Sequence, residues 1–181
     1  MKMLILSVDV GTRNFAMTLY CTRTDEYKLM ELRDLRNYKD YVKTMKLLSE
    51  EEPFLSADVI LVERQMRSIM KTMATAIRAF NFDKTVMVSP QCVKRFFRSS
   101  TRKHATNKKA ARVEALKLLN VKNMRLYKSF KKRDDIADCI LQTHWYLSTI
   151  EKSRRMKGLQ VEKKVNTGRL MKIPEYLTPK L

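Results

Sequence analysis

The stretch Leu4-Ile5-Leu6-Ser7-Val8-Asp9-Val10-Gly11, residues 4–11, is the most informative segment of this chain. Its apolar run has the length of a buried β-strand and is followed by a turn that begins at Gly11. A carboxylate between Val8 and Val10 is costly to bury unless a partner compensates its charge. The stretch therefore predicts a core strand and, at Asp9, a site that requires an acid.

Four further strands are predicted, at residues 15–20, 27–32, 58–63 and 85–88. The first three strands of the chain follow one another closely enough to form an antiparallel meander, and the later two alternate with helices. The predicted helices cover residues 38–48, 68–80, a short segment from Pro90, 106–119 and 134–152. The fold class is therefore α/β, with a mixed five-stranded sheet, antiparallel at one edge and parallel beyond it, flanked by helices. We expect one domain over residues 1–155 and a C-terminal tail, 156–181, to which the sequence assigns no structure.

The composition excludes several classes of protein. With 181 residues, 44% of them hydrophobic, and only 3 glycines, the chain is long enough for a buried core and is neither disordered nor a disulfide scaffold. The three cysteines and two histidines have no spacing typical of a zinc site. Because the cysteines are odd in number and form no Cys-x-x-Cys pair, a reducing intracellular compartment is expected. No apolar run reaches the roughly 18 residues of a membrane span, so no membrane association is expected.

The charge is strongly positive and unevenly distributed. The chain has 38 Lys and Arg against 19 Asp and Glu, a formal net charge of +19. Residues 94–133 alone contain 15 Lys and Arg and one acid, Glu114. This segment lacks the apolar face of a membrane-binding helix, so a nucleic acid is the expected polyanionic partner.

Three further acids stand where they can join Asp9. Glu63 closes the apolar run of residues 59–62, and Asp135 and Asp138 lie three residues apart at the start of the last helix, on one helical face. Each acid alone is explained as well by a strand end or a helix first turn. Together, beside a basic segment, they indicate oxygen ligands for Mg²⁺ or Mn²⁺, in the arrangement by which two ions hydrolyse a phosphodiester.

Three segments together resemble the poxvirus Holliday-junction resolvases, which belong with the RuvC-type resolvases in the ribonuclease H-like superfamily. They are Ser7-Val8-Asp9-Val10-Gly11-Thr12-Arg13-Asn14, Leu61-Val62-Glu63-Arg64-Gln65 and Lys132-Arg133-Asp134-Asp135-Ile136-Ala137-Asp138. The resemblance implies a Mg²⁺- or Mn²⁺-dependent homodimer that makes paired symmetric nicks in four-way DNA junctions. For a poxvirus it implies resolution of concatemeric genomes in the host cytoplasm, with no nucleotide cofactor.

The same resemblance implies roles for individual residues. It makes Asp9, Glu63, Asp135 and Asp138 the catalytic metal ligands, and it places an active-site lysine on the preceding helix. We expect this lysine to be Lys109, with Lys108 the alternative, because the spacing to the acids does not determine the register. Further DNA contacts are expected from basic residues near these segments, namely Arg64, Arg67, Arg98, Arg102, Lys103, Lys108, Lys131 and Lys132.

Three other functions remain open at this point. Residues 9–12 also resemble the phosphate loop of the actin-like ATPases, but those proteins need two duplicated domains and a second glycine-rich loop. A ribonuclease H-type enzyme that cuts RNA in a hybrid duplex would use the same metal chemistry. A non-catalytic basic DNA-binding protein would need none of the four acids for its function.

Overall fold

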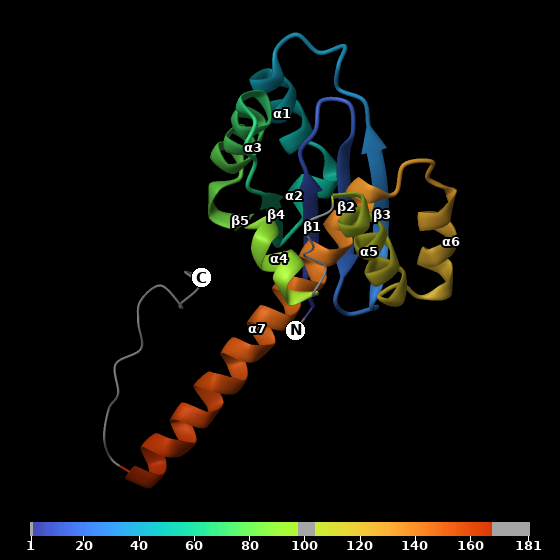
Figure 1. Ribbon diagram of the computed structural model, residues 1–181. Helices are drawn as coiled ribbons and strands as arrows, with labels where there is room; N and C mark the ends of the chain where they lie inside the picture. Colours follow the sequence, from blue (N-terminus) through green and yellow to red (C-terminus); the bar gives the residue numbers. More distant parts are fainter. Residues whose placement is uncertain (1, 98–103, 168–181) are drawn as a thin grey trace. The chain divides into compact units, whose positions relative to one another are not determined.

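The computed structural model describes residues 2–97 and 104–167, with side chains over 2–97 and 106–155. Its centre is a five-stranded sheet in the order β3-β2-β1-β4-β5. The strands are β1 (Leu4–Asp9), β2 (Phe15–Cys21), β3 (Glu26–Arg33), β4 (Val59–Glu63) and β5 (Thr85–Val88). β1, β2 and β3 pair antiparallel, whereas β4 and β5 continue the sheet in parallel (Figure 1). The predicted mixed sheet is confirmed.

The register of two central strands brings two of the predicted acids together. β1 and β4 are parallel, and Val8 lies opposite Val62. Asp9 and Glu63 follow these residues at the carboxyl ends of the two strands. Because side chains alternate between the faces of a sheet, in-register neighbours on parallel strands project to the same face. The pairing alone therefore places both carboxylates at one edge and on one side of the sheet.

The opposite face of the sheet carries most of the hydrophobic core. Leu6, Val8 and Val62 belong to a buried cluster that also includes Met45 and Ile77. These two come from α1 (Tyr41–Ser49) and α3 (Ser68–Phe80), which pack on each other. The short helix α2 (Glu52–Ser56) adds the buried Phe54 to the same cluster. This layer makes the sheet a rigid support for the acids on its other face.

The first turns of the last helix cover the face that bears the acids. α7 (Asp134–Thr167) buries Ile136 and Ile140 completely. The Ser7 hydroxyl donates to Gln142 Oε1 at 3.3 Å, and the Tyr27 hydroxyl donates to the Ile140 carbonyl at 3.4 Å. These polar contacts fix the helix on β1 and β3, so that its amino-terminal acids point toward the carboxyl ends of β1 and β4.

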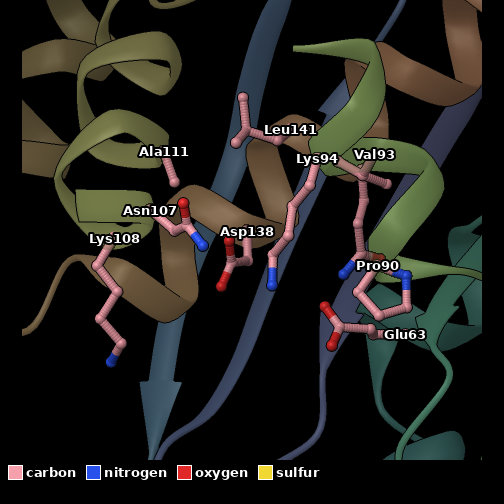
Figure 2. Close-up of a pocket in the computed structure, with 10 residues that line it drawn as sticks. Glu63, Pro90, Val93, Lys94, Asn107, Lys108, Ala111, Asp138 and Leu141 are labelled. Atoms are coloured by element: carbon pink, nitrogen blue, oxygen red, sulfur yellow. The ribbon is translucent and has the colours of Figure 1, made fainter. Parts of the chain in front are cut away.

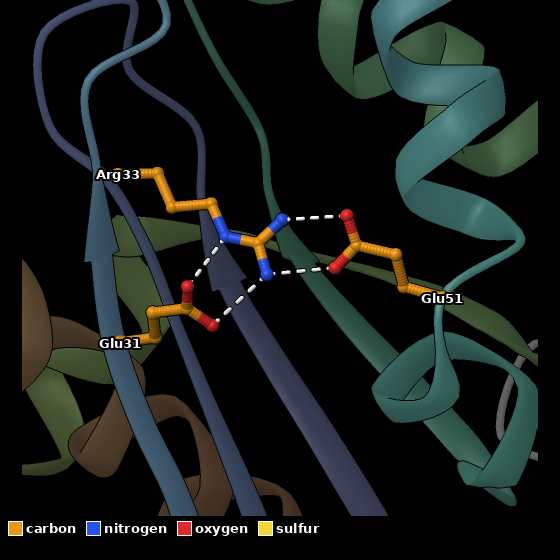
Figure 3. Close-up of polar contacts among 3 residues, drawn as sticks. All are labelled: Glu31, Arg33 and Glu51. Carbon is orange, nitrogen blue, oxygen red and sulfur yellow. Dashed lines mark hydrogen bonds and ion pairs between the residues drawn. The ribbon is translucent and has the colours of Figure 1, made fainter.

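Two local features hold the loops at this end of the sheet. A Cβ atom on Gly11 would lie 2.5 Å from the Asn14 carbonyl oxygen, so the turn between β1 and β2 requires glycine. Arg33, at the end of β3, donates from Nε to Glu31 at 2.6 Å and from Nη1 and Nη2 to Glu51 at 2.7 Å each (Figure 3). This two-sided fork, which raises the pKa of Arg33, ties the edge strand to the turn before α2.

The helices differ from the predicted ones in several places, among them α2 (Glu52–Ser56), which the sequence analysis did not predict, and α1, which begins at Tyr41 and not at residue 38. α5 (His104–Lys117) begins two residues earlier than expected, and α4 (Pro90–Phe96) has proline in its first turn as predicted. α6 (Val121–Ser129) is a helix where the sequence predicted only a basic connection. Its inward side carries a polar residue, Asn123, beside Tyr127, so its apolar periodicity is weak. The backbone of α7 continues past residue 155, where the tail was expected to begin.

Contacts within the chain define two compact units that meet between His144 and Trp145. The first unit contains the sheet and the acids. The described part of the second is the helical continuation to Thr167, in which the Thr149 hydroxyl donates to the Trp145 carbonyl at 2.9 Å. The domain boundary at residue 155 stays a prediction. No helix among the described residues has the length and apolar character needed to cross a membrane.

Candidate functional site

Three of the predicted acids lie together at the ends of β1 and β4 and on the first turns of α7. Burial raises the pKa of Asp9 well above its ordinary value, and the neighbouring carboxylates of Glu63, Asp138 and Asp135 raise it further. Burial, and next Asp138, raise the pKa of Glu63 to about 7. The pKa of Asp138 is about 6, again chiefly because of burial. The cluster thus contains more carboxyl groups than can easily be ionised at the same time.

One hydrogen bond offsets part of this repulsion at Asp9. Gln65, two residues beyond the end of β4, donates from Nε2 to Asp9 Oδ1 at 3.2 Å and lowers the pKa of that carboxyl, an effect smaller than those of burial and the acids. Gln65 lies within the Glu-Arg-Gln segment that carried the resemblance. The sequence did not predict its contact with Asp9.

Lys94 on α4 is a site residue that the sequence analysis did not predict. Its side chain points toward Asp138 and Glu63 (Figure 2), and its positive charge lowers the pKa of both carboxyls. A signal was present in the sequence, because β5 runs parallel to β4 and α4 begins directly after it. The lysine one turn beyond Pro90 is therefore placed at the same end of the sheet as Glu63.

The two other acids at the start of α7 are held by basic side chains. Asp134 binds Lys108 at 3.2 Å and Arg112 at 3.4 Å, both from α5. Lys132 Nζ lies 3.1 Å from Asp135 Oδ2, yet this buried oxygen has no partner with hydrogen-bond geometry. Asp134 therefore anchors α5 to α7, whereas Asp135 keeps an oxygen whose hydrogen-bonding capacity is not used.

A small cavity of about 50 Å³ opens beside the acids. Its lining includes two acids, Glu63 and Asp138, and two lysines, Lys94 and Lys108 (Figure 2). Lys94 lies on α4 and Lys108 lies on α5. Lys109 is exposed and is not among the lining residues. The structure thus places Lys108, the alternative, next to the acidic cluster.

The remaining predicted DNA contacts have different placements. Arg64 and Arg67 are exposed in the segment that follows β4, and Lys131 is exposed before α7. Lys132 is half-buried by its contact with Asp135. Three others, Arg98, Arg102 and Lys103, lie outside the described residues.

The acids fit a divalent cation in their chemistry. They offer only carboxylate oxygens, the ligands that Mg²⁺ and Mn²⁺ prefer, and their mutual repulsion would be relieved by a positive ion. Within the described parts of the chain, no three Asp, Glu, His or Cys side chains come close enough to hold one ion as they stand. The buried Asp135 Oδ2 accepts no hydrogen bond and is one oxygen that could bind such an ion in place of its ion pair with Lys132.

The raised pKa values predict a stability that falls with rising pH. Between about pH 4 and pH 7 the folded protein binds more protons at Glu63 and Asp138 than the unfolded chain does, so the free energy of unfolding decreases as pH rises through this window. We expect it to be a few kcal/mol lower at about pH 8 than at about pH 5 in the absence of metal. Denaturant unfolding at both values measures this, and Asp138→Asn should reduce the difference. An equal difference in that variant would contradict the prediction.

Comparisons with known proteins agree with this architecture. A sequence model of the family described as Poxvirus A22 protein matches residues 3–149. Fowlpox virus resolvase, solved in complex with substrate Holliday junction DNA, is 18% identical, with a TM-score of 0.63 over 82% of this chain and 99% of that one. The yeast mitochondrial Holliday junction resolvase Ydc2 is 17% identical, with a TM-score of 0.57 over 78% of each chain. Thermus thermophilus RuvC is 11% identical, with a TM-score of 0.52 over 81% of this chain and 96% of that one.

No curated protein sequence matches the chain significantly. The structural similarities confirm the predicted ribonuclease H-like fold of the RuvC type. The family match confirms the resemblance to the poxvirus proteins.

Proposed function

We propose that this chain, which belongs to the poxvirus A22 protein family, is an endonuclease that resolves four-way DNA junctions by paired symmetric nicks. The observation that carries this proposal is the partly buried cluster of Asp9, Glu63 and Asp138 at one end of the sheet, inside a protein of net charge +19. Carboxylates withdrawn together from solvent destabilise the fold and repel phosphates, so their presence in a basic protein favours a site in which a cation neutralises them.

The side chains of this cluster have distinct tasks in the proposal. Asp9, Glu63, Asp135 and Asp138 hold Mg²⁺ or Mn²⁺, two ions in each site, and Gln65 keeps the Asp9 carboxylate oriented. When bound, the ions supply activation of a water and neutralisation of the charge that develops on the phosphate. Lys94 and Lys108 place ammonium groups beside the cavity, where they can contact a phosphate oxygen.

The proposal includes a homodimer, because two coordinated nicks in one junction require two active sites. In a poxvirus, such a dimer would resolve concatemeric genomes in the host cytoplasm. Fowlpox virus resolvase and Thermus thermophilus RuvC have both been solved in complex with Holliday junction DNA, which supports a branched DNA as the partner of this chain.

The test is a comparison of substrates. Four-way, three-way and plain duplex DNA and an RNA–DNA hybrid are incubated with the purified protein, with Mg²⁺ or with EDTA. We expect nicks at symmetry-related positions of the four-way junction, only with the metal, and a rate at least about tenfold above that on duplex DNA. Preferential cleavage of the RNA strand of the hybrid would favour the ribonuclease H-type alternative. Binding without any cleavage would favour the non-catalytic one.

A further inference from the structure

α6 presents a row of positive charges that the active-site cluster does not use. Lys122, Arg125 and Lys128 are all exposed, and the helix contains no acid. At about 100° per residue, the three cations occupy an arc of roughly 120° centred opposite the buried Asn123 and Tyr127. The helix therefore has one face for the protein and one face for the solvent, and the solvent face carries all three charges of the helix, each of them positive, beside the exposed Val121 and Ser129.

The protein-facing side attaches α6 firmly to the edge of the sheet. With its amide oxygen toward the strand, Asn123 accepts from the Tyr27 N–H at 2.7 Å and donates to the Tyr27 carbonyl at 3.3 Å. It thereby occupies the N–H and carbonyl that Tyr27, on edge strand β3, would otherwise leave open. The helix packs beside β3 (Figure 1). Fixed in this way, the three cations have defined positions along the sheet edge.

The carboxyl end of α6 is joined to the acidic end of α7. The Tyr127 hydroxyl donates to the Arg133 carbonyl at 3.3 Å, and Arg133 Nε donates to the Phe130 carbonyl at 3.0 Å. Arg133 directly precedes Asp134, the first residue of α7. The basic face thus starts beside the first turn of α7 and leads away from it along β3.

Little negative charge competes for these cations. The nearest acid, Glu26, lies 3.9 Å from Lys122 but binds Lys28 at 3.1 Å, and the Lys122 side chain remains 77% exposed. From Lys122 to Lys128 the helix rises about 9 Å, a length over which duplex DNA presents about five phosphates. Three cations along one face of a packed helix are comparable in number and spacing to the phosphates that one side of such a duplex presents.

We propose that the exposed face of α6 binds the phosphate backbone of a duplex arm of the junction, away from the cleaved bond. This inference rests on the proposed function. It names a contact surface that includes none of the four acids and none of the basic residues for which the sequence predicted DNA contacts. The partner is double-stranded DNA contacted without sequence readout, because lysine and arginine contacts to phosphates determine position rather than sequence.

The test compares two triple variants that remove equal charge. Lys122→Ala/Arg125→Ala/Lys128→Ala removes the proposed contact. The matched control, Lys39→Ala/Lys43→Ala/Lys46→Ala, removes three exposed lysines at and before α1, on the other side of the sheet. Binding to a labelled four-way junction is measured in EDTA over a range of salt concentrations. We expect the α6 variant to bind at least about tenfold more weakly at about 0.1 M salt and to reduce the salt-dependence slope by about 2 to 3, against less than about threefold for the control.

A second measurement identifies the arm as the contact. Methylphosphonates, which are neutral, replace phosphates along one arm outside the cleavage positions. We expect the wild-type protein to bind the modified junction more weakly than the unmodified one. The α6 variant should bind both junctions equally, because its substitutions and the methylphosphonates remove the same contact. Additive losses, or equal losses in the two triple variants, would overturn the inference. Circular dichroism is to be used to check that the variants are folded, and Gln in place of Ala gives a second set of variants.

The outcomes also separate this inference from the proposed function. If the wild-type protein binds a four-way junction no better than plain duplex, the proposed function fails. If the wild-type protein prefers and cuts the junction while the α6 and control variants bind alike, only the role of α6 fails.

Discussion

Replacing Asp9 by Asn is expected to lower the single-turnover rate of junction cleavage by about three orders of magnitude or more while junction binding in EDTA or Ca²⁺ is retained. The physical reason is that Asn removes one charged metal ligand from the centre of the cluster. The Asn side chain keeps an oxygen that can accept the hydrogen bond from Gln65. Since Asp9 is also the acid whose pKa is raised by all three other carboxylates, its neutralisation should relieve repulsion and leave the fold at least as stable near neutral pH.

The matched control for this variant is Asp83→Asn. Asp83 is an exposed acid in the short turn of Phe82–Lys84 before β5, remote in function from the cluster. It should cleave and bind like the wild type. Full nicking by Asp9→Asn would remove Asp9 from the ligands, and loss of junction binding in Ca²⁺ would assign it to DNA recognition instead.

Removal of the two cavity lysines is expected to slow cleavage about a hundredfold for Lys94→Ala and for Lys108→Ala, with Lys109→Ala within about threefold of the wild type. Lys94 and Lys108 line the cavity beside Glu63 and Asp138, and Lys109 is exposed away from it. The measurement is the single-turnover rate at saturating protein, accompanied by the dissociation constant for the junction. The rate should change more than the affinity.

Two further measurements make this prediction specific. Lys94 lowers the pKa of Glu63 and Asp138, so its removal should raise both and extend the pH-dependent loss of stability to higher pH. Lys108 also binds Asp134, so Asp134→Asn serves as its structural control, because it removes that ion pair and keeps the lysine. If Lys108→Ala and Asp134→Asn slow cleavage equally, Lys108 acts by holding α5 in place. If Lys109→Ala is the slowest variant, the original expectation for Lys109 is correct.

The strand pattern was predictable because each strand is encoded locally. The run at residues 4–10 is apolar enough to be a core strand wherever it is placed, and its carboxylate stands out for the same reason. The alternation of strands and helices predicted that the later strands run parallel, but the pairing of β1 with β4, which brings Asp9 and Glu63 together, was not predicted. α6 was missed because its buried side contains an asparagine that bonds to a strand far away in the sequence.

The succession of strands along the chain, the positive charge and the four acids can be read from the residues alone, since these depend on residue type and short-range spacing. Which basic residues lie beside the acids follows from the packing of helices that are far apart in the chain. Lys94 comes from a helix of 7 residues with no pattern of its own, and its position depends on β5 running parallel to β4. The choice between Lys108 and Lys109 is a rotation of about 100° on α5, set by the packing of α5 on α7 through Asp134. Such long-range contacts are not written in the spacing of either helix.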